Sequence, residues 1–264
     1  MTDTVSMPSP ARVFAALLVR DLTVARREIV SLLVRTALQP LLFVIIFGFI
    51  MPRMGIIQAG YTTVLLPGVL GLSLAISAMQ SVTMPMVTDF GFTREIEDRL
   101  LAPIPTYLVA IEKVVNGILQ GLISALFLLP IARLIMGPVP GLTFARFPLL
   151  ILMTILGGAA FSALGLWLGT AIPPQQIGVM FSVILAPMIM FGCTYYPWAG
   201  LRAVPVMQYG VLINPLVYIS EGLRASLTPG VPHMPVLVSI AALLIVIAFF
   251  LRLGLRSFRK KALG

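Results

Sequence analysis

The residues most suited to specific chemistry lie in one short segment between two apolar stretches. Five of the six residues from Arg94 to Arg99 are charged, in a chain in which only 10% of all residues are. Arg94 and Asp98, like Glu95 and Arg99, are four residues apart, the spacing at which opposite charges pair on a water-exposed helix. A second face of that helix is apolar and contains Phe92, Ile96 and Leu100. The pattern indicates docking on a partner or on a membrane surface; the alternative is a solvated turn with coincidental pairing.

The chain lacks the residues that common catalytic and metal sites need. With one histidine and one cysteine, a zinc or iron site of the usual composition is not expected. A Ser-His-Asp arrangement would have to use His233, which has no acid nearby. No GxxxxGK sequence followed by Ser or Thr occurs. No Asp or Glu lies at the centre of an apolar run, where ion-coupled transporters usually need one. We therefore predict no enzymatic activity, no metal and no cofactor in this chain, and either a passive channel or a transporter energised by another subunit.

Six apolar runs are expected to position the charged segment. Hydrophobic residues make up 59% of the chain and the mean hydropathy is +1.06, whereas soluble chains are about 45–50% apolar. About 20 mostly apolar residues cross a hydrocarbon core about 30 Å thick. The runs that reach or approach this length are 35–52, 62–86, 108–136, 147–171, 176–195 and 235–254. The sequence therefore predicts an all-α polytopic membrane protein with six transmembrane helices.

The basic residues are distributed unequally between the two sides that six spans create. The side with both termini and the charged segment has thirteen Lys and Arg, and the other side has five. Cytoplasmic segments carry an excess of these residues, so we predict the inner or plasma membrane with both termini cytoplasmic. The first apolar run is expected to be a retained span, because no signal-peptide pattern precedes it. The net charge of +9 indicates topology and contact with anionic lipid rather than nucleic acid.

An amphipathic helix is predicted ahead of the first span, over residues 9–34. Ser9-Pro10 combines a capping hydroxyl with a proline at the first helical position. Apolar residues follow at helical spacing and arginines lie on the other side, as in helices that lie in the membrane interface. Asp21 and Glu28 interrupt the apolar side. They are expected to be either solvated or paired with basic groups of a neighbouring subunit.

Three of the runs carry side chains suited to packing, and two of these three could also line a transport path. The second run places four polar residues on one helical face, where they either line a path or hydrogen-bond to a neighbouring helix: Ser73, Ser77, Gln80 and Ser81. The fourth run has glycines suited to close packing: Gly157, Gly158, Gly165 and Gly169. The fifth run is rich in adaptable side chains, which either meet varied apolar ligands or fill the bilayer: Met180, Phe181, Met188, Met190 and Phe191.

The segment between the last two runs, 195–230, is too apolar for a free loop and too rich in proline for a span. It begins with Tyr195, Tyr196 and Trp198, rings typical of a bilayer interface, so we predict external re-entrant or interfacial helices. Glu221 and Arg224, three residues apart, either form a local pair or contact a partner that closes the outer mouth. Just before this segment lies Cys193, which cannot form an intrachain disulfide because it is the only cysteine. We expect a small buried thiol; the alternative is pairing between chains.

The predicted domains follow from these segments. Residues 1–34 form the cytoplasmic N-terminus with its interface helix, residues 35–254 the six-span domain, and residues 255–264 a basic cytoplasmic tail. The six-span domain includes the short charged helix at 92–102 and the external segment at 195–230.

Two motifs resemble those of the type-2 ATP-binding-cassette (ABC) exporter permeases. The first is REIEDRLLAPIP followed by Lys113, similar to the acid-rich coupling helix, Leu-Leu-x-Pro turn and Lys that opens span three in that family. The second is external and reads N-P-x-x-Y-x-x-E-x-x-R, formed here by Asn214, Pro215, Tyr218, Glu221 and Arg224, after Pro197 and Pro205. The resemblance covers nearly the whole chain, with both motifs in the expected topological order.

The resemblance implies a transmembrane permease subunit of an ATP-driven exporter. Two permeases, identical or related, would sit on two cytoplasmic ABC ATPase subunits, where ATP and Mg²⁺ bind. Coupling to the ATPase would use Arg94, Glu95, Glu97, Asp98, Arg99, Leu100 and Leu101. The substrate path, lined mainly by spans two and five, would include Ser73, Ser77, Gln80, Met180, Phe181 and Met188. The outer exit would be gated by Asn214, Pro215, Tyr218, Glu221 and Arg224.

The expected substrate is hydrophobic or amphipathic: a drug, a lipid or a glycolipid. Polysaccharide exporters of this family tend to offer aromatic rings along the path, and the second span has no aromatic residue. Export of a polysaccharide, of the O-antigen type, is the alternative within the family. From another class, the alternative is a membrane channel or scaffold that works without an ATPase.

Overall fold

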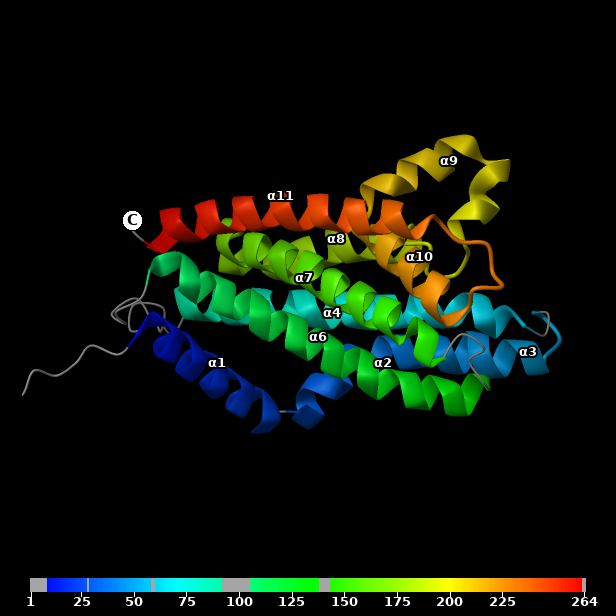
Figure 1. The fold of residues 1–264 in the computed structure, drawn as a ribbon, viewed down its shortest axis with the longest axis horizontal. Helices are drawn as coiled ribbons and strands as arrows, with labels where there is room; N and C mark the ends of the chain where they lie inside the picture. The colour runs from blue at the N-terminus through cyan, green and yellow to red at the C-terminus, as the bar shows by residue number, and fades with distance from the viewer. Residues whose placement is uncertain (1–8, 28, 58–59, 92–104, 138–142, 263–264) are drawn as a thin grey trace, which may run out of the picture.

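The computed structural model describes residues 9–27, 29–57, 60–91, 105–137 and 143–262, and in these ranges the chain is helical without strands (Figure 1). The α-helices are α1 (Pro10–Arg27), α2 (Ile29–Ile45), α3 (Met51–Arg53), α4 (Tyr61–Gly91), α6 (Thr106–Met136), α7 (Phe147–Ala171), α8 (Ile177–Met190), α9 (Pro205–Gly210), α10 (Pro215–Leu227) and α11 (Val236–Ala262). A π-helical turn, Ile46–Ile50, joins α2 to α3. Short 3-10 turns precede α7 to α10: Phe144–Arg146, Pro174–Gln176, Trp198–Ala203 and Val211–Ile213.

Four helices of the described part are long and apolar enough to cross a membrane: Tyr61–Gly91, Thr106–Met136, Phe144–Ala171 and Val236–Ala262. The first and fifth predicted spans correspond to shorter apolar helices, Leu38–Arg53 and Pro174–Met190. The structure therefore confirms an all-α polytopic membrane protein, and the complete six-span layout stays a prediction.

The expected fifth span is wrong at its outer end, because α8 stops at Met190 instead of continuing to residue 195. The last carbonyls of a helix have no partner within the helix and need one elsewhere. Here the Asn214 amide donates to the carbonyl of Met188 (2.9 Å) and the Tyr196 hydroxyl to that of Met190 (3.0 Å). The chain then turns through Cys193, whose φ of 53° lies in the left-handed region. Side chains from later in the sequence thus end this helix.

Helix α4 lies at the centre of the bundle and contacts α2, α6, α7 and α10. Glycines at the contacts let the neighbouring segments approach α4 closely. A Cβ at Gly165 of α7 would press on the carbonyl of Met79 in α4, and a Cβ at Gly68 of α4 would overlap the backbone of Thr194. Leucines such as Leu65, Leu72 and Leu74 are buried along α4. The predicted close packing of the fourth span is confirmed at Gly165.

The long helices run side by side along the long axis, which gives the bundle two distinct ends (Figure 1). One end holds the start of α1, the end of α4, the start of α6 and the end of α11, and we call it the α1 end. The other holds α3 and α9, and we call it the α9 end. Both ends of the described chain, residues 9 and 262, therefore belong to the α1 end.

The amphipathic helix α1 begins at Pro10, as predicted, and the carbonyl of Ser9 accepts the N–H groups of Arg12 (2.9 Å) and Val13 (3.2 Å). Several of its apolar residues, such as Phe14, Leu18 and Leu22, are partly buried, and the helix contacts α6 and α2. All four of its arginines are exposed: Arg12, Arg20, Arg26 and Arg27. The helix thus lies along the bundle with its arginines outward.

Candidate functional site

The predicted ATPase-coupling residues lie outside the residues that the structure describes; they are Arg94, Glu95, Glu97, Asp98, Arg99, Leu100 and Leu101. The helices on either side of them are described. Helix α4 is described up to Gly91 and α6 begins at Thr106, both at the α1 end of the bundle. The residues around these two helix ends form the first part of the candidate site.

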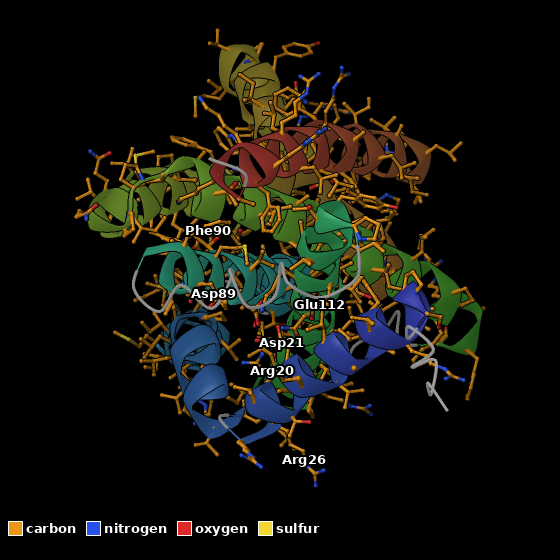
Figure 2. All side chains as sticks on the ribbon, turned by 90° about the vertical axis from the view of Figure 1, so that its left-hand side faces the viewer. Arg20, Asp21, Arg26, Asp89, Phe90 and Glu112 are labelled. Carbon is orange, nitrogen blue, oxygen red and sulfur yellow. The ribbon has the colours of Figure 1, made fainter. Side chains whose placement is uncertain are left out.

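Among the described residues, four charged side chains are buried near the α1 end: Asp21 of α1, Asp89 of α4, and Glu112 and Lys113 of α6. We call them the buried charge cluster. Figure 2 labels the three acids. The Lys113 ammonium donates to the Asp21 carboxylate, and it lies 4.0 Å from an oxygen of Asp89. Lys113 is only 2% exposed. One cation therefore joins three helices, from positions far apart in the sequence.

The expectation for Asp21 is wrong in both of its forms. The side chain is buried rather than solvated, and it pairs with Lys113 of its own chain rather than with a neighbouring subunit. An amphipathic helix tolerates an acid on its apolar side when that side packs on a protein surface that supplies a buried cation. Glu28 lies outside the described residues.

The buried charge cluster holds α1 at the bases of α4 and α6. A buried charge is stable only when it is paired, and removing one partner of a buried pair costs about 3–5 kcal/mol. Helices α4 and α6 are also the two helices that residues 92–104 connect. A force applied to that connecting segment therefore acts on helices that are joined to α1 through Lys113.

A second buried ion pair lies toward the α9 end, where Arg224 and Glu221 of α10 pair directly. The predicted local pair is therefore present. Arg224 also donates to the carbonyls of Val64 (3.1 Å) and Cys193 (3.0 Å). The Glu221 carboxylate also accepts the backbone N–H groups of Trp198 (2.8 Å) and Met234 (2.8 Å). Both side chains are fully buried, so the pair joins α10 to four separate segments of the chain.

The other residues of the external motif shape the start of α10. The Asn214 side chain accepts the N–H of Leu216 (3.0 Å) as an N-cap, and Pro215 occupies the first helical position. The Tyr218 hydroxyl donates to the carbonyl of Leu212 (2.6 Å). Helix α10 is buried over most of its length against α4, α7 and α11. The structure thus brings all five motif residues together on one helix inside the bundle; their role as a gate stays a prediction.

An apolar cavity of about 480 Å³ lies beside this helix, between α8 and residues 207–215. Met188 lines it, together with the motif residues Asn214 and Pro215. The other lining residues are almost all apolar: Val183, Ile184, Pro187, Phe191, Met207, Gly210, Val211 and Ile213. Such a cavity suits an apolar group rather than a sugar.

The remaining path candidates are not brought to this cavity. The Ser73 hydroxyl lies 2.8 Å from that of Ser124, and the Ser77 hydroxyl donates to the carbonyl of Gln120 (3.2 Å). Both serines are fully buried between α4 and α6, which is the packing alternative for the polar face. Gln80 and Met180 are partly buried and Phe181 is buried in the core. Sequence reasoning missed the partner role of Lys113 and Asp89, although isolated charges next to apolar runs were the signal.

Comparison with known proteins identifies relatives over most of the chain. Residues 12–228 match the family described as ABC-2 type transporter. The chain is 28% identical over 229 residues to a protein named inner membrane transport permease YadH from Escherichia coli strain K12, which covers 84% of this chain and 85% of that protein. The proteins of the same name from Escherichia coli O157:H7 and Shigella flexneri match equally.

Proposed function

We propose that this chain, which belongs to the ABC-2 type transporter family and is the multi-pass permease subunit of an ABC transporter in the inner membrane, exports an apolar or amphipathic substrate. The substrate, a drug, lipid or glycolipid, would leave the cytoplasm or the inner leaflet. Permeases of this family work with ABC ATPase partners. ATP and Mg²⁺ would bind on two separate ATPase subunits and not on this chain, and two permease copies, identical or related, would enclose the path. Both termini would lie in the cytoplasm.

The buried charge cluster is the observation that carries the coupling mechanism. The residues from Arg94 to Leu101 would dock on the ATPase through their charges and apolar face. Movement of the ATPase would pull on the ends of α4 and α6, which share Lys113 with α1. These three helices would therefore move as one body instead of bending separately.

The apolar cavity beside α10 supports the substrate class. Its lining contains flexible methionines and one phenylalanine, a surface that adapts to different apolar groups. A sugar would leave hydroxyl groups without hydrogen-bond partners there, since Asn214 is the one polar side chain in the lining and already bonds Met188 and Leu216. A lipid chain or an apolar drug would meet no such penalty.

The docking step is tested by reversing the charges of the segment. Glu97→Lys with Asp98→Lys should reduce co-purification of the ATPase encoded beside this permease, or abolish stimulation of its ATP hydrolysis. Arg133→Gln, which neutralises an exposed arginine of α6 at the other end, serves as the control. If no ATPase associates with the unmodified chain, the channel or scaffold alternative replaces export. If the charge reversal leaves assembly and coupling intact, the docking role of the segment is wrong.

A cysteine at position 97 tests the topology independently. In a Cys193→Ala background, Glu97→Cys should react with a membrane-impermeant maleimide only after the cell membrane is opened. Reaction in intact cells would place the segment outside and would overturn the orientation.

A further inference from the structure

We propose that the α1 end carries a binding site for an anionic phospholipid, between the start of α6 and the end of α11. A cavity of about 460 Å³ lies there, separate from the buried charge cluster. On α11 it is lined by Arg256 and Arg259 and by the apolar Leu255 and Phe258. Residues 105–107, at the start of α6, complete the lining. The inference does not depend on which substrate the permease carries.

The position of the two arginines along α11 matches the level of lipid head groups. The helix has 27 residues and is therefore about 40 Å long, which is longer than a hydrocarbon core of about 30 Å. About 20 residues cross that core. If Val236 lies at one boundary, Leu255 and Arg256 lie at the other, and Arg259 follows almost one turn further. The apolar part of the cavity thus meets acyl chains, and its arginines meet phosphate.

The same helix lies at the surface of the bundle and packs on it along one side only. Only 11% of its most apolar stretch is buried within the bundle, so α11 is peripheral. A lipid therefore reaches the cavity by lateral diffusion, without passing between helices. Four residues of α11 are buried: Ser239, Leu243, Gly254 and Phe258. Of these, Phe258 lines the cavity, and it packs in one apolar cluster with Val109 and Ala110, which makes this wall of the cavity rigid.

Charge complementarity selects an anionic head group. Arg256 and Arg259 are exposed, and neither forms an ion pair or hydrogen bond with another residue of the described chain. Two guanidinium groups bind a phosphodiester with paired N–H donors, which a single ammonium does not achieve. Thr106 and Tyr107 also line the cavity, and hydroxyl side chains of this kind can hydrogen-bond to the glycerol hydroxyls of phosphatidylglycerol. A zwitterionic choline head group would bring its own cation close to the arginines and bind more weakly.

The test is native mass spectrometry of the detergent-purified chain with equal concentrations of dioleoyl phosphatidylglycerol and dioleoyl phosphatidylcholine. We expect the unmodified chain to retain phosphatidylglycerol preferentially. The double variant Arg256→Gln/Arg259→Gln should lower its affinity for phosphatidylglycerol by about 100-fold, because each guanidinium gives up a charge-assisted hydrogen bond to the phosphate. Its affinity for phosphatidylcholine should not change.

The matched control removes the same charge from the same helix outside the cavity. Arg252→Gln/Lys260→Gln neutralises two exposed side chains of α11 that do not line the cavity, and should reduce phosphatidylglycerol binding less than about threefold. An equal loss in this control would show general surface attraction and overturn the site. Undiminished phosphatidylglycerol binding in the first variant would also overturn it. Loss of ATPase co-purification with intact lipid binding would assign the cavity to a protein partner instead.

Discussion

Replacing Arg224 by methionine tests how the external segment is held in the bundle. The substitution keeps an unbranched side chain of moderate length but removes the guanidinium. That group pairs with Glu221 and donates to the carbonyls of Val64 and Cys193. Since Arg224 is fully buried, water does not replace these partners while the fold stays intact. The variant therefore leaves a buried carboxylate without its cation, and the carbonyls of Val64 and Cys193 lose the hydrogen bonds from the guanidinium.

The expected loss of stability is about 4 kcal/mol. Removing one partner of a buried ion pair costs about 3–5 kcal/mol. Glu221 keeps its two backbone donors, from Trp198 and Met234, so we expect a loss of stability below the upper end of this range. A loss of about 4 kcal/mol corresponds to an approximately 10³-fold larger open population.

The assay uses Cys193, the only cysteine of the chain. Its thiol is fully buried, and its carbonyl accepts a hydrogen bond from Arg224 itself. A water-soluble maleimide therefore reacts only when this region opens, and the reaction rate reports the open population. Arg224→Met should accelerate the reaction of Cys193 by about 10³-fold. Arg202→Met, which removes an exposed arginine of the same external segment, serves as the control and should not change the rate.

A double variant separates the ion pair from the loss of volume. Glu221→Gln added to Arg224→Met removes the unpaired buried carboxylate, so the rate should fall by about tenfold relative to Arg224→Met alone. An acceleration below about threefold in Arg224→Met, or the same acceleration in Arg202→Met, would refute the reasoning. A double variant that is as fast as the single variant would show that packing, and not the charge pair, holds the segment.

Two further substitutions test the other contacts that fix α4. Lys113→Met leaves buried carboxylates from α1 and α4 without their shared cation and should lower the free energy of unfolding by about 3–5 kcal/mol in detergent. The control Arg133→Met replaces an exposed arginine of the same helix and should change the free energy of unfolding by no more than about 0.5 kcal/mol. Equal stability of the two variants would exclude a structural role for the cluster. Gly68→Ala should destabilise the α9 end by about 1–3 kcal/mol, seen as faster Cys193 labelling, because the new methyl group overlaps the backbone of Thr194. Gly178→Ala in α8 meets no atom within 4 Å and should be neutral or stabilising, so a similar effect of both alanines would mean that crowding at Gly68 does not matter.

The sequence predicted local features of the fold well where the cause is local. The start of α1 at Pro10 follows from the backbone preferences of Ser9 and Pro10. The start of α10 also has a local cause, because Asn214 caps the helix and Pro215 occupies its first position. The Glu221–Arg224 pair is local as well, since three residues separate its members on one helix. Each of these features depends on residues within one or two helical turns.

The features that sequence reasoning missed depend on contacts between distant segments. Asp21 and Lys113 are separated by 92 positions, and a helical pattern shows which side of α1 carries the acid but not what that side meets. The polar face of α4 poses the same problem: spacing aligned Ser73 with Ser77, and only the structure shows that Ser124 lies opposite. The end of α8 depends on Asn214, which lies 26 positions from the carbonyl it contacts. Periodicity in the sequence shows which residues share a helical face, whereas tertiary packing determines which residues that face contacts.

Helix α4 provides the physical link between the two buried ion-pair sites. Near its end, Asp89 lies beside Lys113, and near its start, the carbonyl of Val64 accepts from Arg224. Between these points α4 is buried, closely packed against α7 at Gly165 and hydrogen-bonded to α6 at Ser73. A helix held in this way does not bend independently of its neighbours, because packed interiors resist deformation. A displacement imposed at the α1 end would therefore reach the segment around Cys193 as a movement of the whole helix, and labelling of that cysteine would report on both ends of the permease.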